Sequence, residues 1–308
     1  MLVAAIDIGS NSVKLAVGDV DGQGHVRITQ TDRFTLQIGR QVELDGALGS
    51  DVIGSVAHAV GAFATRARLA GARRIDVVGT SAAREATDGK ALEDAVSAAA
   101  GVPMRCLSGE EEAHLVSRSI EASSGMPIHD AVMLDIGGGS TEIVRSQGGL
   151  VQRRVSMPIG AVRLTDRLEL RGADALTAAQ IDALDAAISE ALDTIEPHAR
   201  VDRAFGCGGI VTLAGRMVHF GMPPVGTGIN GADRLLLERD DVMALREQLQ
   251  HSTVEARMAA AGTTQARAEI LPAGIALLDA CMRHLQVEML QVHEHGIRTG
   301  LLADIALR

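Results

Sequence analysis

Two short segments of the sequence carry an aspartate, a glycine and a serine in the same order. Alignment of residues 3–14 with residues 131–142 pairs four identical residues, which are Asp7 with Asp135, Ile8 with Ile136, Gly9 with Gly137, and Ser12 with Ser140. A carboxylate at the end of an apolar strand, beside a turn whose small residues expose backbone N–H groups, can hold a metal–phosphate complex. A glycine that simply closes a hairpin accounts for either copy alone. Two copies favour two phosphate-binding turns, one in each half of the chain, with a cleft between them.

Strands alternate with helices along the whole chain. The apolar patterns predict strands over residues 2–6, 13–20, 25–38, 75–79, 103–107, 131–136, 142–145, 150–156, 203–205 and 289–292. Helical spacing predicts helices over residues 51–69, 91–100, 110–121, 161–170 and 177–195, further helices up to about residue 285, and a closing helix from residue 297. This alternation indicates an α/β layer fold. Small residues over 122–127 mark a linker, so we predict domains of residues 1–124 and 125–308.

The composition excludes several classes of protein. The 308 residues include four phenylalanines, no tyrosine and no tryptophan, and the formal net charge is -10. Nucleic-acid binding depends on basic contacts and often on aromatic stacking, so we expect no nucleic-acid partner. No apolar run reaches the roughly 18 residues that span a bilayer, and no basic region precedes the first apolar stretch. We therefore expect no membrane segment, no signal peptide and a cytoplasmic location.

Several motifs carry a resemblance to known proteins. The doubled hairpin resembles the actin, sugar-kinase and heat-shock chaperone superfamily. Within it, four segments are similar in order and spacing to the exopolyphosphatase and guanosine pentaphosphate phosphohydrolase family, namely AIDIGSNSVKL (5–15), GTSAAREA (79–86), LSGEEEAHL (107–115) and DIGGGSTEIV (135–144). ILPAGIALL (270–278) and HGIRTGLL (295–302) also fit. The resemblance thus covers nearly the whole chain.

The resemblance implies a fold and an activity. The expected fold is α/β, with two actin-like (ribonuclease H-like) lobes and a cleft between them. The expected reaction is removal of the terminal phosphate from inorganic polyphosphate, or of the 5′ γ-phosphate from guanosine pentaphosphate, with Mg²⁺ or else Mn²⁺ as cofactor. The missing aromatic residues favour polyphosphate, and the resemblance also implies a homodimer. The alternatives are an actin-fold kinase that uses ATP and a small acceptor, and a phosphate or nucleotide sensor that binds without turnover.

Carboxylates are the candidates for the metal and for the base. Glu110, Glu111 and Glu112 open a predicted helix, where acidic residues are common because the helix dipole favours them. In the resemblance, Glu112 is the residue that activates water, with Glu111 as its nearest competitor. Glu142 lies on the same strand face as Ser140 because side chains alternate. The resemblance makes Glu142 a second catalytic or metal-associated carboxylate.

Other residues are predicted to hold the metal or the phosphates. Asp7 and Asp135 are the expected Mg²⁺ anchors, through water. The expected phosphate contacts are the hydroxyl and amide side chains of Ser10, Asn11, Ser12, Ser140 and Thr141, the backbone of Gly137, Gly138, Gly139, Gly208 and Gly209, and the cations Lys14, Arg84 and Arg298. A solvated strand lysine accounts for Lys14 otherwise, and a helix-surface arginine for Arg84. Cys207 and Ile210 stand where the family usually has small hydroxylated residues, which leaves the backbone of the third glycine turn as its phosphate contact.

Overall fold

The computed structural model describes two compact units. The described residues are 1–124, 129–172, 174–196, 201, 203–221, 235–294 and 296–307. Unit 1 comprises Met1–Ile128, Arg153–Ser156 and His295–Arg308, and unit 2 comprises His129–Gln152 and Met157–Glu294. The prediction gave each domain one continuous stretch of chain, divided between residues 124 and 125. Each of these units instead consists of separate segments. The last helix belongs to unit 1 because it packs on the first sheet.

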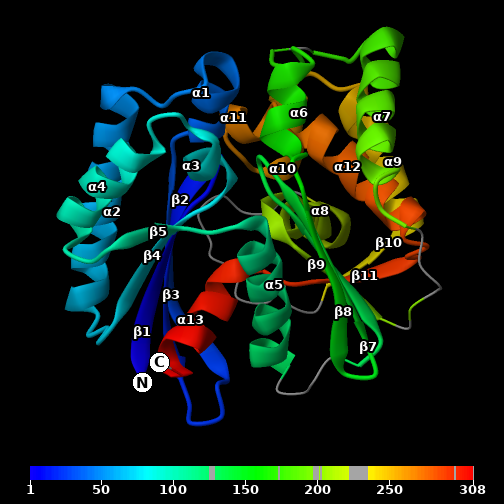
Figure 1. The fold of residues 1–308 in the computed structure, drawn as a ribbon. Coiled ribbons are helices and arrows are strands. Elements are labelled where there is room, and N and C mark those ends of the chain that lie inside the picture. The colour runs from blue at the N-terminus through cyan, green and yellow to red at the C-terminus, as the bar shows by residue number, and fades with distance from the viewer. Residues whose placement is uncertain are drawn as a thin grey trace. The chain divides into compact units, whose positions relative to one another are not determined.

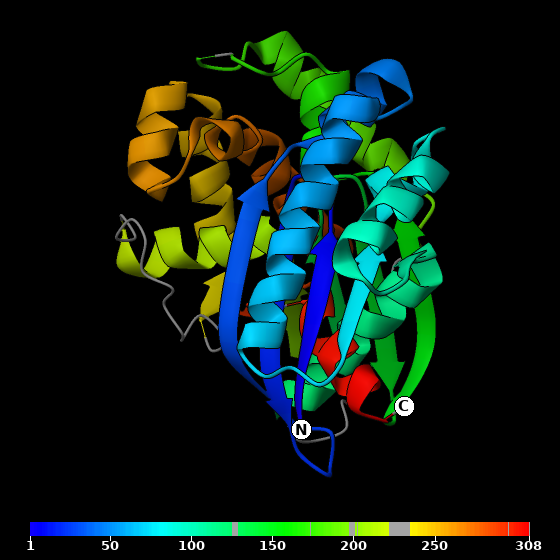
Figure 2. The same cartoon turned by 90° about the vertical axis from the view of Figure 1, so that its left-hand side faces the viewer.

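Unit 1 is a five-stranded sheet with helices on both faces. In spatial order its strands are β3 (Val26–Thr35), β2 (Ser12–Val20), β1 (Leu2–Ile8), β4 (Ile75–Gly79) and β5 (Met104–Cys106). One face packs on α2 (Ser50–Leu69) and α4 (Gly89–Ala100), and α2 crosses in front of the strands in Figure 2. The other face packs on α5 (Gly109–Ser124) and α13 (Ile297–Leu307), which lie side by side (Figure 1).

Strand alternation decides which side chains of β1 meet which helices. Ala4, Ile6 and Ile8 belong to the core under α2 and α4. Val3 and Ala5 belong to the core with α5 and α13. Asp7 follows the second set because residues two apart share a face, so its carboxylate lies on the face that α5 covers.

Unit 2 repeats this plan in its own sheet. In spatial order its strands are β10 (Leu236–Glu238), β11 (Met289–Val292), β9 (Arg203–Cys207), β6 (Ala131–Ile136), β7 (Thr141–Gln147) and β8 (Leu150–Met157). Its helices are α6 (Ala161–Arg167), α7 (Ala178–Leu192), α8 (Gly208–Phe220), α9 (Arg239–Gln250), α10 (Val254–Ala261), α11 (Gln265–Ala268) and α12 (Leu271–His284). Helix α12 is buried along almost its whole length and packs on α6, α7, α8 and α9.

The internal repeat of the sequence is also a repeat of topology. β1 pairs antiparallel with β2 and parallel with β4. β6 likewise pairs antiparallel with β7 and parallel with β9. Both predicted hairpins are therefore confirmed.

The structure differs from the predicted elements at four places. The strand predicted to reach residue 38 ends at Thr35, because Gln37 has the left-handed backbone conformation (φ 52°) and α1 (Ile38–Asp45) follows. Residues 122–124 of the predicted linker are the last turn of α5, and residues 125–127 lie outside the described part. Helix α6 stops at Arg167 because Glu169 is left-handed (φ 52°). The short strand β10 was not predicted.

Candidate active site

The two glycine turns close in the same way. In unit 1 the Gly9 amide donates to the Ser12 carbonyl at 3.1 Å. In unit 2 the Gly137 amide donates to the Ser140 carbonyl at 2.9 Å. Each turn therefore presents a short run of backbone between its two strands.

Backbone amides that follow the third strand hold the carbonyls of the unit 1 turn. The Ser10 carbonyl accepts from the Gly39 amide at 2.7 Å. The Asn11 carbonyl accepts from the amides of Leu36 at 3.2 Å and Gln37 at 3.0 Å. The carbonyls of Ser10 and Asn11 are therefore occupied inside the protein.

The unit 2 turn is held in the same manner. The Gly137 carbonyl accepts from the first amide of α6 at 3.1 Å, and the Gly138 carbonyl accepts from the next two at 2.8 and 3.0 Å. The Gly139 carbonyl accepts from Nε of Arg163 at 2.9 Å. Arg163, whose own amide also contacts Gly138, was not among the predicted residues.

Four backbone amides of the two turns, unlike these carbonyls, have no hydrogen-bond partner among the described residues. Within the described residues, no hydrogen-bond acceptor meets the backbone N–H of Ser10, Asn11, Gly138 or Gly139. A trans peptide unit points its C=O and its N–H in opposite directions. Holding the Ser10 carbonyl therefore directs the Asn11 amide away from α1, and holding Gly137 and Gly138 does the same for the amides of Gly138 and Gly139. Successive N–H groups of a turn that are open in this way can bind an anion.

Asp7 is a buried carboxylate with one oxygen left open. It is 4% exposed. Its Oδ2 lies 3.7 Å from Nζ of Lys14, its cross-strand neighbour. Its Oδ1 has no hydrogen-bond partner among the described residues, and the same holds for Oδ1 of Asn11. A buried oxygen without a partner is costly, so this edge of unit 1 suits a hydrated cation or a phosphate with its water.

In unit 2 the corresponding pair is two carboxylates. Asp135 and Glu142 are direct cross-strand neighbours and are 8% and 3% exposed. Directly opposed like charges repel each other, and Glu142 takes the place that Lys14 has in unit 1. An oxygen-only donor pair fits Mg²⁺, which binds through one or two carboxylates and keeps several waters. The described residues contain no group of three or more His, Cys, Asp or Glu side chains that could hold a metal by themselves.

Glu112 is held by an arginine inside unit 1. Glu112 is 4% exposed, and its Oε1 accepts from Nη1 of Arg84 at 2.5 Å. The same nitrogen donates to the Leu107 carbonyl at 2.5 Å. Burial alone lowers the pKa of Arg84, but the hydrogen bond and charge of Glu112 raise it above its ordinary value. Arg84, predicted as a phosphate clamp, thus orients a carboxylate within unit 1.

Glu111 has a different task from Glu112. Its carboxylate accepts from the Ser108 amide at 2.8 Å, while the Ser108 hydroxyl accepts from the Glu111 amide at 3.2 Å. This reciprocal pair is a capping box at the start of α5. The hydrogen bond from the Ser108 backbone, with help from Arg105 at 3.2 Å, lowers the pKa of Glu111. Because the cap occupies the Glu111 carboxylate and leaves it half-exposed, the buried Glu112 is the better candidate of the two.

Removing the cap should destabilise the protein in a pH-dependent way. We expect Glu111→Ala to lower the free energy of unfolding by about 1 kcal/mol at neutral pH, because it removes the carboxylate that accepts from the Ser108 amide. Glu111 contributes this stability above its unfolded pKa of 4.5 and loses it as the pH falls through its lower folded value. Urea denaturation at neutral and acidic pH measures both, with Ser55→Ala on the exposed side of α2 as control. An equal loss at both pH values contradicts the role of the Glu111 carboxylate.

The third glycine turn opens helix α8. Gly208 has φ +93°, and a Cβ there would lie 2.3 Å from the Ile136 carbonyl oxygen and 2.7 Å from Oδ1 of Asp135. Only glycine fits this approach. The Gly209 carbonyl accepts from Nη2 of Arg267 at 2.7 Å. The prediction missed Arg267 because it lies 58 residues from Gly209 along the chain. Its place three residues before the ILPAG motif was the available signal.

Several other predicted phosphate ligands have partners inside the protein. The Thr141 hydroxyl, fully buried, donates to the Ile159 carbonyl at 2.7 Å, so it supports the turn rather than facing a ligand. The Ser12 hydroxyl lies 3.4 Å from that of Thr35. Arg298, 7% exposed, donates to the Leu15 carbonyl at 3.3 Å within unit 1.

The predicted residues therefore fall into two groups, one in each unit. Unit 1 contains the acid and base candidates with one turn, namely Asp7, Ser10, Asn11, Ser12, Lys14, Arg84, Glu111, Glu112 and Arg298. Unit 2 contains the carboxylate pair with the other two turns, namely Asp135, Gly137, Gly138, Gly139, Ser140, Thr141, Glu142, Gly208 and Gly209.

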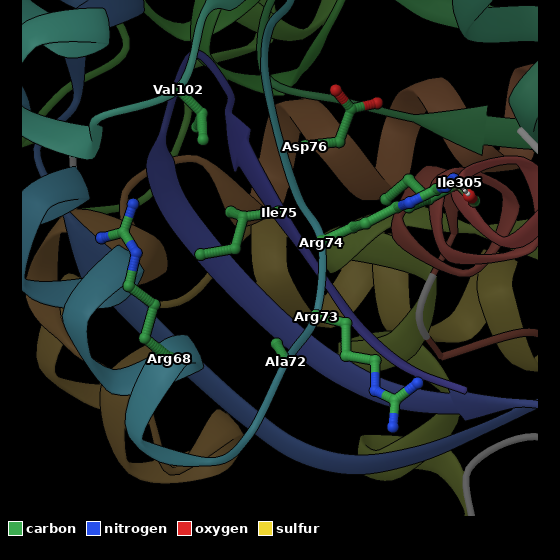
Figure 3. Close-up of a pocket in the computed structure, with 8 residues that line it drawn as sticks. All are labelled: Arg68, Ala72, Arg73, Arg74, Ile75, Asp76, Val102 and Ile305. Carbon is green, nitrogen blue, oxygen red and sulfur yellow. Dashed lines mark hydrogen bonds between the residues drawn. The ribbon is translucent and has the colours of Figure 1, made fainter.

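A cavity in unit 1 lies apart from these residues. It measures about 420 Å³ and is lined by Arg68, Arg73, Arg74 and the start of β4. The glycine turn of unit 1 follows the carboxyl end of β1, whereas the cavity lies at the amino end of the parallel strand β4. The three arginine side chains point in different directions (Figure 3), and Arg68 and Arg74 donate to backbone carbonyls. They do not converge on one anion.

The fold defines an α/β protein of the actin-like class with a similar glycine turn in each unit. Comparison of the sequence narrows this class, because residues 16–308 match the Ppx/GppA phosphatase family. The chain belongs to that family. The match begins after the unit 1 turn, so Asp7 and Lys14 lie outside it.

Individual relatives are similar over their full length. The chain is 28% identical to "Exopolyphosphatase 2" of Mycobacterium tuberculosis, over 99% of this chain and 98% of the relative. A solved Ppx/GppA family member of Aquifex aeolicus matches 100% of this chain and 98% of that one, with TM-score 0.82 and 24% identity. A solved exopolyphosphatase of Cytophaga hutchinsonii covers 99% and 97%, with TM-score 0.85 and 22% identity. These structures confirm the predicted fold class. Within the described residues, no helix is long and apolar enough to cross a membrane.

Proposed function

We propose that this protein is an exopolyphosphatase, which hydrolyses the terminal phosphoanhydride of inorganic polyphosphate and releases orthophosphate with Mg²⁺. One observation carries the proposal. The carbonyls of Ser10, Asn11 and Gly137–Gly139 are bonded within the protein, while the amides of Asn11, Gly138 and Gly139 meet no acceptor among the described residues. Two such turns suit a ligand that carries phosphates along its length.

The side chains supply the rest of the reaction. Glu112 takes a proton from a water molecule as that water attacks the terminal phosphorus, the bridging P–O bond breaks, and the shortened chain leaves with the bridging oxygen. Arg84 holds Glu112 in the orientation that receives the proton. Asp135 and Glu142, with Asp7, would hold the metal. Bound Mg²⁺ supplies neutralisation of the phosphate charge.

The choice of substrate rests on the relatives and on composition. The full-length relative in Mycobacterium tuberculosis carries the name exopolyphosphatase. The chain has four phenylalanines and no other aromatic residue, which leaves few rings for stacking a guanine. Both points favour a bare phosphate chain over guanosine pentaphosphate.

Orthophosphate release tests this proposal. Short polyphosphate, long polyphosphate and guanosine pentaphosphate are compared under one Mg²⁺ concentration, and we expect turnover to be highest on polyphosphate. Faster turnover of guanosine pentaphosphate than of polyphosphate contradicts the proposed substrate. ADP formation from ATP that requires a small acceptor indicates a kinase, and calorimetric binding of tripolyphosphate without turnover indicates a sensor.

Two further proposals rest on the family resemblance and the sequence. We propose a homodimer and a cytoplasmic location. Sedimentation velocity tests the first, with a mass of one 32.1 kDa chain as the contradicting result. Fractionation of the source cells tests the second.

A further inference from the structure

Helices α1 and α6 both begin without a side-chain cap. The N-cap residues are Gln37 and Gly160, and neither accepts a hydrogen bond through a side chain. The first amides of a helix have no partner within it and need acceptors from elsewhere. The phosphate turns supply those acceptors, since Ser10 bonds the second amide of α1 and Gly137 and Gly138 bond the first three of α6. Each turn thus caps the helix that follows the third strand of its unit.

Glycine permits this close contact in both units. A Cβ at Gly39 would lie 2.6 Å from Cβ of Ser10. A Cβ at Gly160 would lie 2.5 Å from the Gly138 carbonyl oxygen and 2.8 Å from the Gly139 amide nitrogen. Gly160 has φ -159°, an extended conformation that any residue adopts. Space, rather than backbone conformation, therefore requires glycine at this position.

The arrangement has the same chain order in both units. In each, a hairpin is followed by a third strand and then by the helix that contacts the turn, β3 with α1 and β8 with α6. A side chain reinforces each contact, Ser12 toward Thr35 in unit 1 and Thr141 toward Ile159 in unit 2. The duplication thus extends beyond the hairpins to the parts that hold them.

We infer that Gly39 and Gly160 are positioning residues, through which α1 and α6 fix the turn carbonyls and so aim the turn amides at phosphate. This inference rests on the proposed function. The amides of Asn11, Gly138 and Gly139 point away from the helices only while the carbonyls are held, because each peptide unit is planar and trans. An added methyl group must push the turn off its helix and change that aim. Misplacement by about 1 Å can cost on the order of 10²-fold in rate.

Three glycine-to-alanine variants test the inference by kinetics. We expect Gly39→Ala and Gly160→Ala each to lower kcat/KM for tripolyphosphate by at least about tenfold. This is less than the roughly 10²-fold loss for a misplacement of about 1 Å. The matched control is Gly54→Ala in α2, where no heavy atom lies within 4 Å of the added Cβ. Gly39 and Gly54 are both helical glycines, so helix propensity favours alanine equally at both. Thermal unfolding of every variant checks that it is folded.

A local probe separates misaimed amides from general damage. The sequence has two asparagines, Asn11 and Asn230, so protein labelled with 15N-asparagine gives two backbone signals, assigned with Asn230→Asp. Tripolyphosphate with Mg²⁺ is added in a Glu112→Gln background that prevents turnover. We expect the Asn11 signal to shift in the parent and in Gly160→Ala, and to lose most of that shift in Gly39→Ala.

Milder variants cover the case in which an alanine variant does not fold. Thr141→Val removes the hydroxyl that holds Ile159, and we expect a lower kcat/KM that Thr141→Ser restores. Wild-type kcat/KM in folded Gly39→Ala and Gly160→Ala overturns the inference, as does an unchanged Asn11 shift in Gly39→Ala or the absence of any shift in the parent. A shift that Gly39→Ala removes, in a protein that releases no orthophosphate, supports the positioning role and refutes the hydrolase.

Discussion

Glu112→Gln is expected to lower kcat for orthophosphate release from polyphosphate by about 10²–10⁴-fold, the usual contribution of a general base. Glutamine keeps the size and one carbonyl oxygen of the side chain, so the contact with Arg84 can persist. What it loses is the ability to accept a proton from water. KM should change far less than kcat, because the amides of the turns and not Glu112 bind the phosphates.

The neighbouring glutamate provides a matched control for this substitution. Glu111→Gln changes the same chemical group one residue away, at a side chain that is 51% exposed and bound into the capping box. We expect its kcat to stay within about twofold of the wild type, with a loss of stability of about 0.3–1 kcal/mol, because glutamine keeps the capping box and loses only the charge that the helix dipole favours. If Glu111→Gln abolishes turnover and Glu112→Gln does not, the roles of the two glutamates are reversed.

Glu142→Gln is expected to have the second large effect, through the metal. In unit 1 the carboxylate of Asp7 has a lysine as cross-strand neighbour, whereas in unit 2 that of Asp135 has Glu142. The lysine adds a positive charge beside Asp7, whereas Glu142 adds a second negative charge beside Asp135, which fits the cation that we propose there. Removing one charge should raise the Mg²⁺ concentration for half-maximal activity at least tenfold and lower kcat on the order of 10²-fold.

The metal role has a readout that does not need activity. Mg²⁺ should raise the thermal unfolding temperature of the wild type, because a ligand that binds the folded state stabilises it. This increase should be lost in Glu142→Gln and kept in Asp19→Asn, a half-exposed strand carboxylate that pairs with the N-terminus. An unchanged Mg²⁺ stabilisation in Glu142→Gln places the cation elsewhere.

Much of this protein follows from its sequence alone. Apolar alternation and helical spacing are local patterns, so they predicted nearly every strand and helix, and the repeated Asp–Gly–Ser order predicted both hairpins. Local patterns failed where one residue changes the backbone, as at Gln37, whose left-handed conformation ends β3 early. They also failed at β10, a strand of three residues that depends on its pairing with β11.

The chemistry of single side chains was decided by the tertiary structure. The family resemblance favoured Glu112 over Glu111 without giving a physical reason. The structure supplies one, because Arg84 of α3 (Ser81–Glu85) contacts Glu112 and the Ser108 amide binds Glu111. Arg163 and Arg267 contact turn carbonyls from 24 and 58 residues away along the chain. The residue types and the order of the turns were set by the sequence, but which carbonyls are bonded and which amides stay open depends on helices that only folding brings to the turn.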